Sequence, residues 1–147
     1  MSNYNKSYQN NQYSQTSSRK PTWITATKNG FNVWKTQIVI PEIIGTIEEV
    51  DWKLEKWENG KFIESIPSPK GCSIPEGYKR TVVLKVRMPS GDEYQINLTT
   101  PQTRSYQEFK SQLKAAGKDL RTITTKMKPY RSAYQGKTFT DITFQEV

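Results

Sequence analysis

The 147-residue sequence contains no histidine and a single cysteine, Cys72. The absence of histidine removes the commonest general base, and one cysteine without histidine cannot form a Cys/His zinc site. A lone cysteine also cannot form an internal disulfide, so nothing here indicates an oxidising compartment. We therefore predict a protein that is not an enzyme and that uses no metal and no cofactor.

Long apolar segments are also missing. A membrane-spanning helix needs roughly 20 apolar residues, and the longest apolar run, 37–47, is interrupted by Pro41 and Glu42. The N-terminus lacks the apolar stretch of a secretory signal peptide. We expect no membrane partner and a cytoplasmic location, which would be the host cytoplasm for a viral protein.

Acidic residues are scarce compared with basic ones. The chain has 22 Lys and Arg against 14 Asp and Glu, a formal net charge of +8, and a pI near 9.5. Residues 1–41 contain five basic and no acidic residues, and residues 101–147 contain nine basic and four acidic ones. The segment 42–64 is the exception, with three basic and seven acidic residues. This uneven surplus favours an anionic partner, and nucleic-acid binders concentrate positive charge in this way.

The N-terminal segment 1–22 differs from the rest of the chain. It contains no acidic residue and no Val, Ile, Leu or Phe, and it is rich in Asn, Gln, Ser and Tyr. Such a segment cannot bury enough apolar surface to offset its ordering entropy. We predict that residues 1–22 form a disordered basic tail and that residues 23–147 form one domain. The composition of the tail is typical of segments that self-associate into a homo-oligomer, although an inert leader fits equally well.

Alternating apolar and polar residues predict three β-hairpins after the tail. Asn-Gly pairs at 29–30 and 59–60 each lie between alternating arms, the strongest short-range hairpin signal. A third hairpin is expected where 78–88 turns into 93–100. The residues of its first arm that should face the core are Val82, Leu84, Val86 and Met88.

One helix and two closing strands complete the pattern. A capping box of Ser105 and Glu108 predicts a helix over 106–116, which ends before Gly117. Strands are expected in 120–128 and 137–147. This order predicts a mainly β fold: a five-stranded OB-fold barrel with one helix between strands three and four, plus an extra N-terminal hairpin. Strand one would lie within 37–58, strand two at 61–66 and strand three at 78–99.

The segment that joins the last two strands carries the most suggestive chemistry. In an OB-fold this loop is one of two that close over an oligonucleotide. Its basic side chains could contact phosphates and its aromatic rings could stack on bases. Alternatively, the tyrosines pack back on the barrel and the lysines are solvated. The candidate nucleic-acid-binding residues of this segment are Lys126, Lys128, Tyr130, Arg131, Tyr134 and Lys137.

Further candidates lie on the earlier hairpins. Trp57 should lie opposite Phe62 across the turn at 59–60, either as a stabilising cross-strand pair or as a stacking platform. The remaining candidates are Trp34, Lys85 and Arg87.

A carboxylate cluster in the first long strand is the best case for a metal-dependent nuclease. Glu49 and Asp51 should, however, share a strand face with Lys53 and Glu55. We therefore expect a solvated, salt-bridged face there and no metal site.

The element order and the basic, aromatic loops resemble the OB-fold single-stranded DNA-binding proteins, especially the small ones of phages and plasmids. The resemblance covers residues 31–147 and implies a non-catalytic protein that coats single strands in DNA replication, recombination and repair. Cellular bacterial members often end in an acidic tip that recruits partners, but here the final residues, TDITFQEV, should form a strand. An RNA-binding OB module remains an alternative because stacking and phosphate contacts serve both nucleic acids. A protein-interaction module that uses the acidic hairpin 42–64 is the other alternative.

Overall fold

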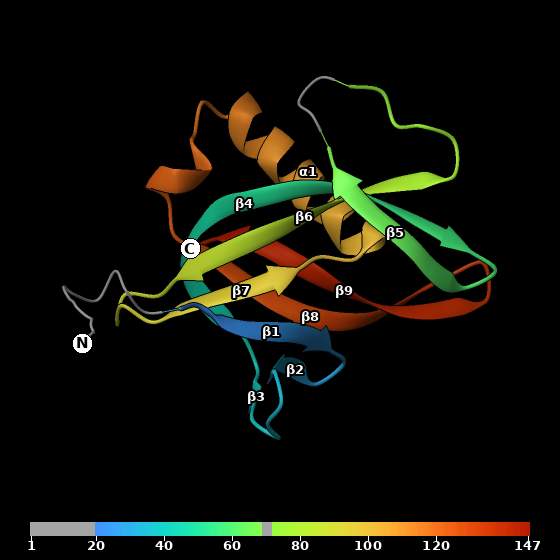
Figure 1. The fold of residues 1–147 in the computed structure, drawn as a ribbon. Helices are drawn as coiled ribbons and strands as arrows, with labels where there is room; N and C mark the ends of the chain where they lie inside the picture. The colour runs from blue at the N-terminus through green and yellow to red at the C-terminus, as the bar shows by residue number, and fades with distance from the viewer. Residues whose placement is uncertain (1–19, 69–71) are drawn as a thin grey trace, which may run out of the picture.

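The computed structural model describes residues 20–68 and 72–147, and this part of the chain is mainly β (Figure 1). The predicted mainly β class with one α-helix is confirmed. The elements of the described residues are β1 (Thr22–Thr27), β2 (Gly30–Val33), β3 (Val39–Ile40), β4 (Ile43–Glu58), β5 (Lys61–Pro67), β6 (Tyr78–Arg87), β7 (Glu93–Asn97), α1 (Thr100–Ala115), the 3₁₀ helix η3 (Leu120–Thr122), β8 (Thr125–Tyr134) and β9 (Lys137–Glu146).

The described strands form one nine-stranded sheet that does not close. Its order is β3-β2-β1-β7-β6-β4-β8-β9, with β5 paired to β4 beside this path. The prediction of a closed barrel of five strands is therefore not what the structure shows. The long strand β4 explains much of the difference, because it pairs with β8 over Ile43 to Gly45, with β6 from Thr46 onward and with β5 near its end.

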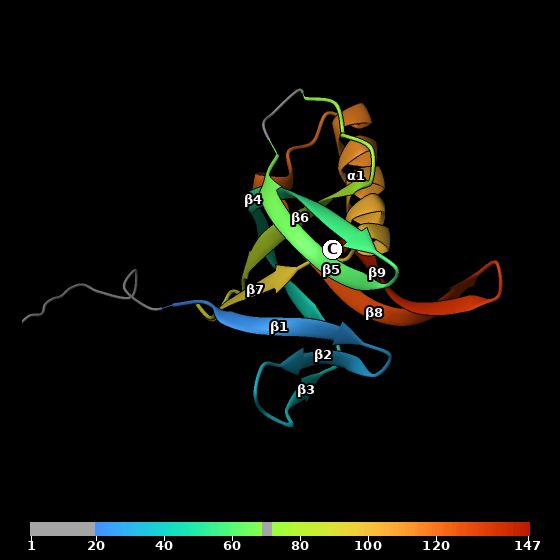
Figure 2. The ribbon, with the colours of Figure 1, turned by 45° about the vertical axis from the view of Figure 1, so that its right-hand side comes forward.

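The segment 61–66 does not take the position predicted for strand two. Lys53 of β4 pairs with Thr81 of β6 and with Pro67 of β5, so β5 and β6 lie on opposite edges of β4. The β4–β5 hairpin is thus an extension of the sheet (Figure 2). All three predicted hairpins are nevertheless present as the antiparallel pairs β1–β2, β4–β5 and β6–β7.

The N-terminal hairpin β1–β2 is hydrogen-bonded into the main sheet. Strand β1 pairs in parallel with β7, with Thr22 beside Tyr94 and Trp23 beside Gln95, and is the first strand of the sheet in the chain. Residues 1–19 of the predicted tail lie outside the described residues. Thr22, which was assigned to the tail, already belongs to β1.

The core lies between the sheet and α1. The inward positions predicted on β6 are correct: Val82, Leu84 and Val86 are fully buried, and Met88 packs against the same cluster partly buried. The helix contributes the buried side chains Gln102, Thr103, Tyr106, Phe109 and Leu113. From Thr103 onward they recur every three or four residues, which places them on one face. No helix in the described residues is long and apolar enough to cross a membrane.

The helix begins six residues earlier than predicted. Thr99 is the N-cap, and it forms a capping box with Gln102 while Pro101 lies in the first turn. A proline there loses no hydrogen bond and suits the first turn. Ser105 instead donates its hydroxyl hydrogen to the Asp141 carboxylate at 2.8 Å, which ties α1 to β9. The predicted end is correct, since Gly117 follows with a φ of 74°.

Candidate nucleic-acid interface

The segment expected to be a loop between the last two strands is a regular β-hairpin. Strand β8 continues to Tyr134 and β9 begins at Lys137, and Pro129 lies within the ladder opposite Ile142. The loop is only the pair Gln135 and Gly136, whose φ angles of 50° and 79° fit the two-residue turn that matches strand twist. The loop expected between 128 and 137 is therefore shorter than predicted, because β8 extends to Tyr134, and the charged and aromatic residues lie on a hydrogen-bonded ribbon that extends from the molecule (Figure 2).

Strand alternation separates the candidate residues of this hairpin into two faces. Even-numbered positions of β8 share one face, and Lys137 joins them because it pairs with Tyr134. We call this set the tyrosine face; it consists of Lys126, Lys128, Tyr130, Tyr134 and Lys137. Arg131 points to the opposite face, where its guanidinium lies 3.4 Å from the Thr138 hydroxyl. The prediction grouped all six residues, and the structure brings five of them together.

The two tyrosine rings are available to a ligand to different degrees. Tyr134 is 68% exposed and Tyr130 is 40% exposed. The Tyr130 hydroxyl donates a long hydrogen bond of 3.4 Å to Asp141, and burial together with this carboxylate raises its pKa. The Tyr134 hydroxyl accepts a long hydrogen bond of 3.5 Å from the Gln135 side-chain amide. The rings therefore do not pack into the core, and a base could stack on either.

The positive charge of the hairpin is not neutralised by neighbouring acids. In residues 20–68 and 72–147, no ion pair involves Lys126, Lys128, Arg131 or Lys137. The Asp141 carboxylate is buried and accepts hydrogen bonds from the Ser105 hydroxyl and the Ile142 backbone amide. The hairpin thus presents several cations that an approaching phosphate chain could neutralise.

The two predicted binding residues on β6, Lys85 and Arg87, already have acidic partners. Lys85 forms an ion pair with Glu48 at 3.1 Å, and Arg87 forms one with Glu93 at 3.0 Å. In the order of the sheet, β4 separates these residues from β8 and β9. Lys85 and Arg87 are therefore outside the tyrosine face, and a phosphate would have to compete with carboxylates for them.

Trp57 and Phe62 lie opposite one another as predicted. Their ring centroids are 5.5 Å apart with an edge-to-face angle of 74°, and both rings are about half exposed. The contact supports the cross-strand interpretation, because such pairs stabilise a two-stranded ribbon. Both rings lie near the tip of the β4–β5 hairpin.

Trp34 lies in the tight turn that joins β2 to β3, and its indole is 58% exposed. The Lys35 ammonium lies 4.8 Å from the centre of this ring. The backbone amide of Trp34 donates to the carbonyl oxygen of Trp23, another exposed tryptophan, which is not among the predicted binding residues. The alternation around the inward Ile24 could have identified Trp23 as an outward residue.

Comparisons with protein-family models, with curated protein sequences and with solved structures each return no significant match for this chain. The functional argument therefore depends on the arrangement of its own side chains.

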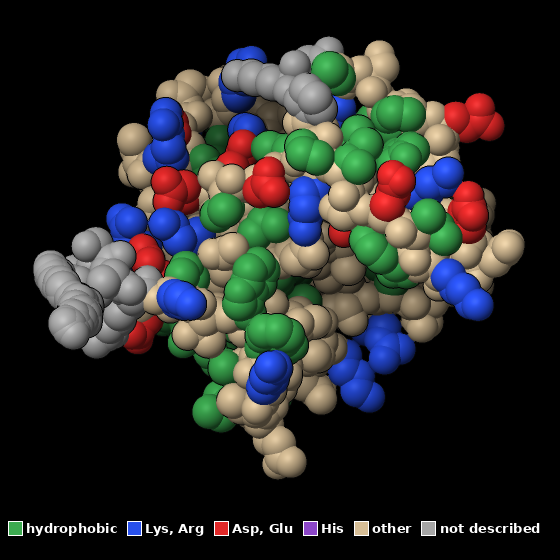
Figure 3. Space-filling view, in the orientation of Figure 1, with side chains coloured by type: hydrophobic (Ala, Val, Ile, Leu, Met, Phe, Trp, Pro, Cys, Tyr) green, Lys and Arg blue, Asp and Glu red, His purple; other side chains and the backbone are tan. Residues whose placement is uncertain are grey.

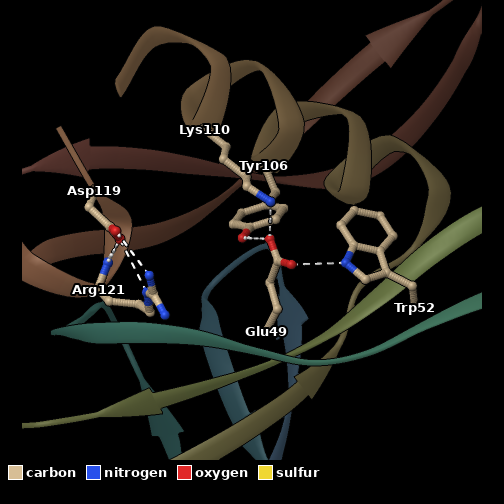
Figure 4. A network of polar contacts seen from close by, with 6 residues as sticks. All are labelled: Glu49, Trp52, Tyr106, Lys110, Asp119 and Arg121. Carbon is tan, nitrogen blue, oxygen red and sulfur yellow. Dashed lines mark hydrogen bonds and ion pairs between the residues drawn. The ribbon is translucent and has the colours of Figure 1, made fainter. Parts of the chain in front are cut away.

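The expected shared face of Glu49 and Asp51 is wrong. A β-bulge between these residues shifts the register of β4 against β6. Glu49 consequently points toward α1, where its carboxylate accepts hydrogen bonds from the Tyr106 hydroxyl, the Lys110 ammonium and, at 3.0 Å, the Trp52 indole (Figure 4). The described residues contain no group of acids and Cys able to hold a metal ion. The Glu49 cluster therefore joins the helix to the sheet.

A hollow of about 590 Å³ adjoins this cluster, between β4, the C-terminal part of α1 and η3. Its rim carries several basic side chains that are not among the predicted binding residues, including Lys110, Lys114 and Arg121. Most of these charges are already paired: Lys110 with Glu49 and Arg121 with Asp119 (Figure 4). Compared with the tyrosine face, the hollow offers little uncompensated charge.

The Glu49 cluster predicts a specific acid sensitivity. Burial raises the pKa of Glu49, but the hydrogen bonds from Lys110, Tyr106 and Trp52 outweigh it, so the pKa is lowered from 4.5. A lowered folded-state pKa means that the ionised group stabilises the fold above its unfolded pKa and that this stabilisation is lost as pH falls through the folded pKa. We expect thermal stability to fall below about pH 4.5, with a smaller fall in Glu49→Gln. Melting temperatures from pH 7 to pH 3 measure this, and equal acid slopes in both proteins would contradict it.

Proposed function

We propose that this protein is a non-catalytic single-stranded DNA-binding protein. The observation that carries the proposal is the tyrosine face, on which three lysines that form no ion pair within the described residues flank two exposed tyrosine rings. Phosphates of an extended strand would contact the lysines, and unpaired bases would stack on the rings. A net charge of +8 adds long-range attraction for the same ligand.

The strand order supports a variant of the OB-fold as the framework for this function. Five strands follow the order β7-β6-β4-β8-β9, and α1 lies between β7 and β8 in the chain. An OB-fold is a partly open barrel of five strands whose loops bind oligonucleotides. In our proposal the seam between β7 and β9 is open, because β1 occupies the free edge of β7. The β8–β9 hairpin then corresponds to one of the two ligand-binding connections.

The proposed contacts explain why binding would tolerate many sequences. Every base has a face that can stack, and phosphates are the same at each nucleotide. A protein that uses these contacts would coat exposed single strands, which is the task required in replication, recombination and repair.

A titration with three ligands tests the function itself. We expect oligo-dT to bind more tightly than duplex DNA of the same length, because the bases of a duplex are already stacked and cannot reach the rings. Fluorescence anisotropy of labelled oligonucleotides at two salt concentrations measures the difference. Tighter binding of matched single-stranded RNA would favour the RNA-binding alternative, and equal affinity for the duplex would contradict the proposal.

The two faces of the β8–β9 hairpin provide a matched pair of charge variants. Lys128→Ala removes a cation of the tyrosine face, and Arg131→Ala removes one from the opposite face of the same strand. Each lost phosphate contact on a single strand should reduce the log–log salt slope by roughly 0.7. We expect this change for Lys128→Ala and a smaller one for Arg131→Ala.

Dissociation constants for oligo-dT across a salt series provide the slopes. If Arg131→Ala reduces the slope more than Lys128→Ala does, the DNA strand binds the Arg131 face of the hairpin, and our assignment of the tyrosine face is wrong.

A further inference from the structure

The segment 22–40, which contains β1, β2 and β3, exposes large aromatic side chains on its surface. Two tryptophans on it, Trp34 and Trp23, are 58% and 38% exposed. Residues 20–41 contain three lysines and no acidic residue. Figure 3 shows hydrophobic and basic side chains together over this lower part of the molecule. A large exposed indole is costly in water, and it marks a binding surface when it belongs to a group of apolar residues.

Backbone and side-chain hydrogen bonds hold Trp34 in place. The Thr36 amide donates to the Val33 carbonyl at 3.0 Å, and the Val33 amide donates to the Ile38 carbonyl at 2.9 Å. The Asn32 side chain donates to the carbonyls of Thr36 and Ile38. The exposed ring is thus carried by an ordered turn, so little conformational entropy would be lost when a ligand covers it.

Lys35 has a backbone conformation that the turn imposes at a cost. Its φ of 63° lies in the left-handed region, where glycine would be favoured. Such strained residues persist where the surroundings or a function require the side chain. This conformation places the Lys35 ammonium 4.8 Å from the centre of the Trp34 ring. A ring for a base and an adjacent cation for its phosphate are the two contacts that one unpaired nucleotide needs.

The hydrogen bond from the Trp34 amide to the Trp23 carbonyl joins the two tryptophan positions. Trp23 lies beside Gln95 of β7, and Gln95 lies opposite Lys85 of β6. The surface therefore continues from the N-terminal hairpin onto the outer face of the sheet.

We propose that Trp34, Trp23 and Lys35 form a second stacking platform, which binds unpaired bases of the single strand that the β8–β9 hairpin holds. The platform rests on the proposed function and extends it. The platform lies on β1 and on the connection between β2 and β3, which precede the five OB-like β-strands in the chain. It therefore adds to the surface along which one DNA strand could bind. The segment 20–41, which carries the platform, contains three lysines and no acidic residue, and this charge complements a phosphate chain.

The test compares Trp34→Ala, Trp34→Phe and Ile38→Ala in the full chain. We expect Trp34→Ala to weaken binding of an oligo-dT of about 16 nucleotides by roughly 5- to 140-fold, which corresponds to 1–3 kcal/mol per stacked base. Trp34→Phe should retain most of the affinity, because it keeps a ring. Ile38→Ala is the control, since Ile38 is an equally exposed apolar residue of the same connection without a ring.

The outcomes separate the platform from the function on which it rests. If Trp34→Ala binds normally while Tyr134→Ala is weakened, the platform is wrong and the proposed function stands. If the unaltered protein does not bind oligo-dT, both are wrong. An unchanged affinity together with a changed molar mass by light scattering in Trp34→Ala would show that the surface contacts another copy of the chain, and this would also overturn the platform. Circular dichroism melting confirms that each variant is folded.

Discussion

Replacing Tyr134 with alanine is expected to weaken binding of oligo-dT by about 5- to 140-fold, because one stacked base contributes roughly 1–3 kcal/mol. The ring is 68% exposed near the tip of the β8–β9 hairpin, and Tyr134 is not among the described hydrophobic residues that pack against the core cluster. The substitution should therefore leave the melting temperature nearly unchanged. The slope of affinity against salt should also stay the same, since no charge is removed. Anisotropy titrations and a thermal melt measure the three quantities.

The matched control is Tyr134→Phe, which keeps the ring and removes the hydroxyl. It should bind almost as well as the unaltered protein, because the stacking ring is kept and the hydrogen bond that is lost, from the Gln135 amide, is long at 3.5 Å. Tyr130→Phe serves the same purpose on the adjacent ring, where it also removes the hydrogen bond to Asp141. A lower melting temperature with unchanged affinity in Tyr134→Ala would mean that the tyrosines are structural, and the tyrosine face would lose its proposed role.

The Gly45→Ala substitution is expected to destabilise the fold strongly. A Cβ at this position would lie 2.4 Å from the Arg87 carbonyl oxygen and 2.9 Å from its carbon. These atoms belong to the backbone of β6, which is paired with β4 from Thr46 onward, so they cannot move without disturbing the ladder. Overpacking of this kind costs about 1–3 kcal/mol, or more where the site cannot relax. For a domain of this size the melting temperature should fall by roughly 3–12 °C.

Gly60→Ala provides the comparison for Gly45→Ala. Gly60 has a φ of 77° and no atom within 4 Å of an added Cβ, so alanine there incurs only the cost of the left-handed conformation. That cost is about 1–2 kcal/mol. If Gly45→Ala proves less destabilising than Gly60→Ala, β4 and β6 do not approach as closely as the structure has them.

The distribution of ion pairs distinguishes the surfaces that could bind a polyanion. Around the hollow beside α1 and along β6, most basic side chains have a carboxylate within ion-pair distance. On the described β8–β9 hairpin and the β1–β3 segment, the lysines have none. A phosphate chain gains more from cations that it need not take from an acid, because binding then releases counterions without breaking an existing pair.

Much of the local structure could be predicted from the sequence. The Asn-Gly pairs predicted two hairpins, and alternation predicted which residues of β6 face the core, because both signals depend on neighbours a few residues away. Gly117 likewise predicted where α1 ends. The helix start was predicted wrongly because Thr99 and Ser105 each begin a capping-box sequence, and in the structure only Thr99 caps the helix while Ser105 bonds Asp141 of β9.

The sequence by itself determined the mainly β class, the hairpins and the basic, aromatic composition of the last two strands. Only the tertiary structure decided that β1 pairs with β7, that β5 and β6 take opposite edges of β4, and that the bulge beside Glu49 turns its carboxylate toward α1. It also decided that Tyr130 and Tyr134 share a face from which Arg131 is excluded. The physical reason is that strand pairing and register depend on contacts between residues far apart in the chain, and a shift of one residue moves every following side chain to the other face.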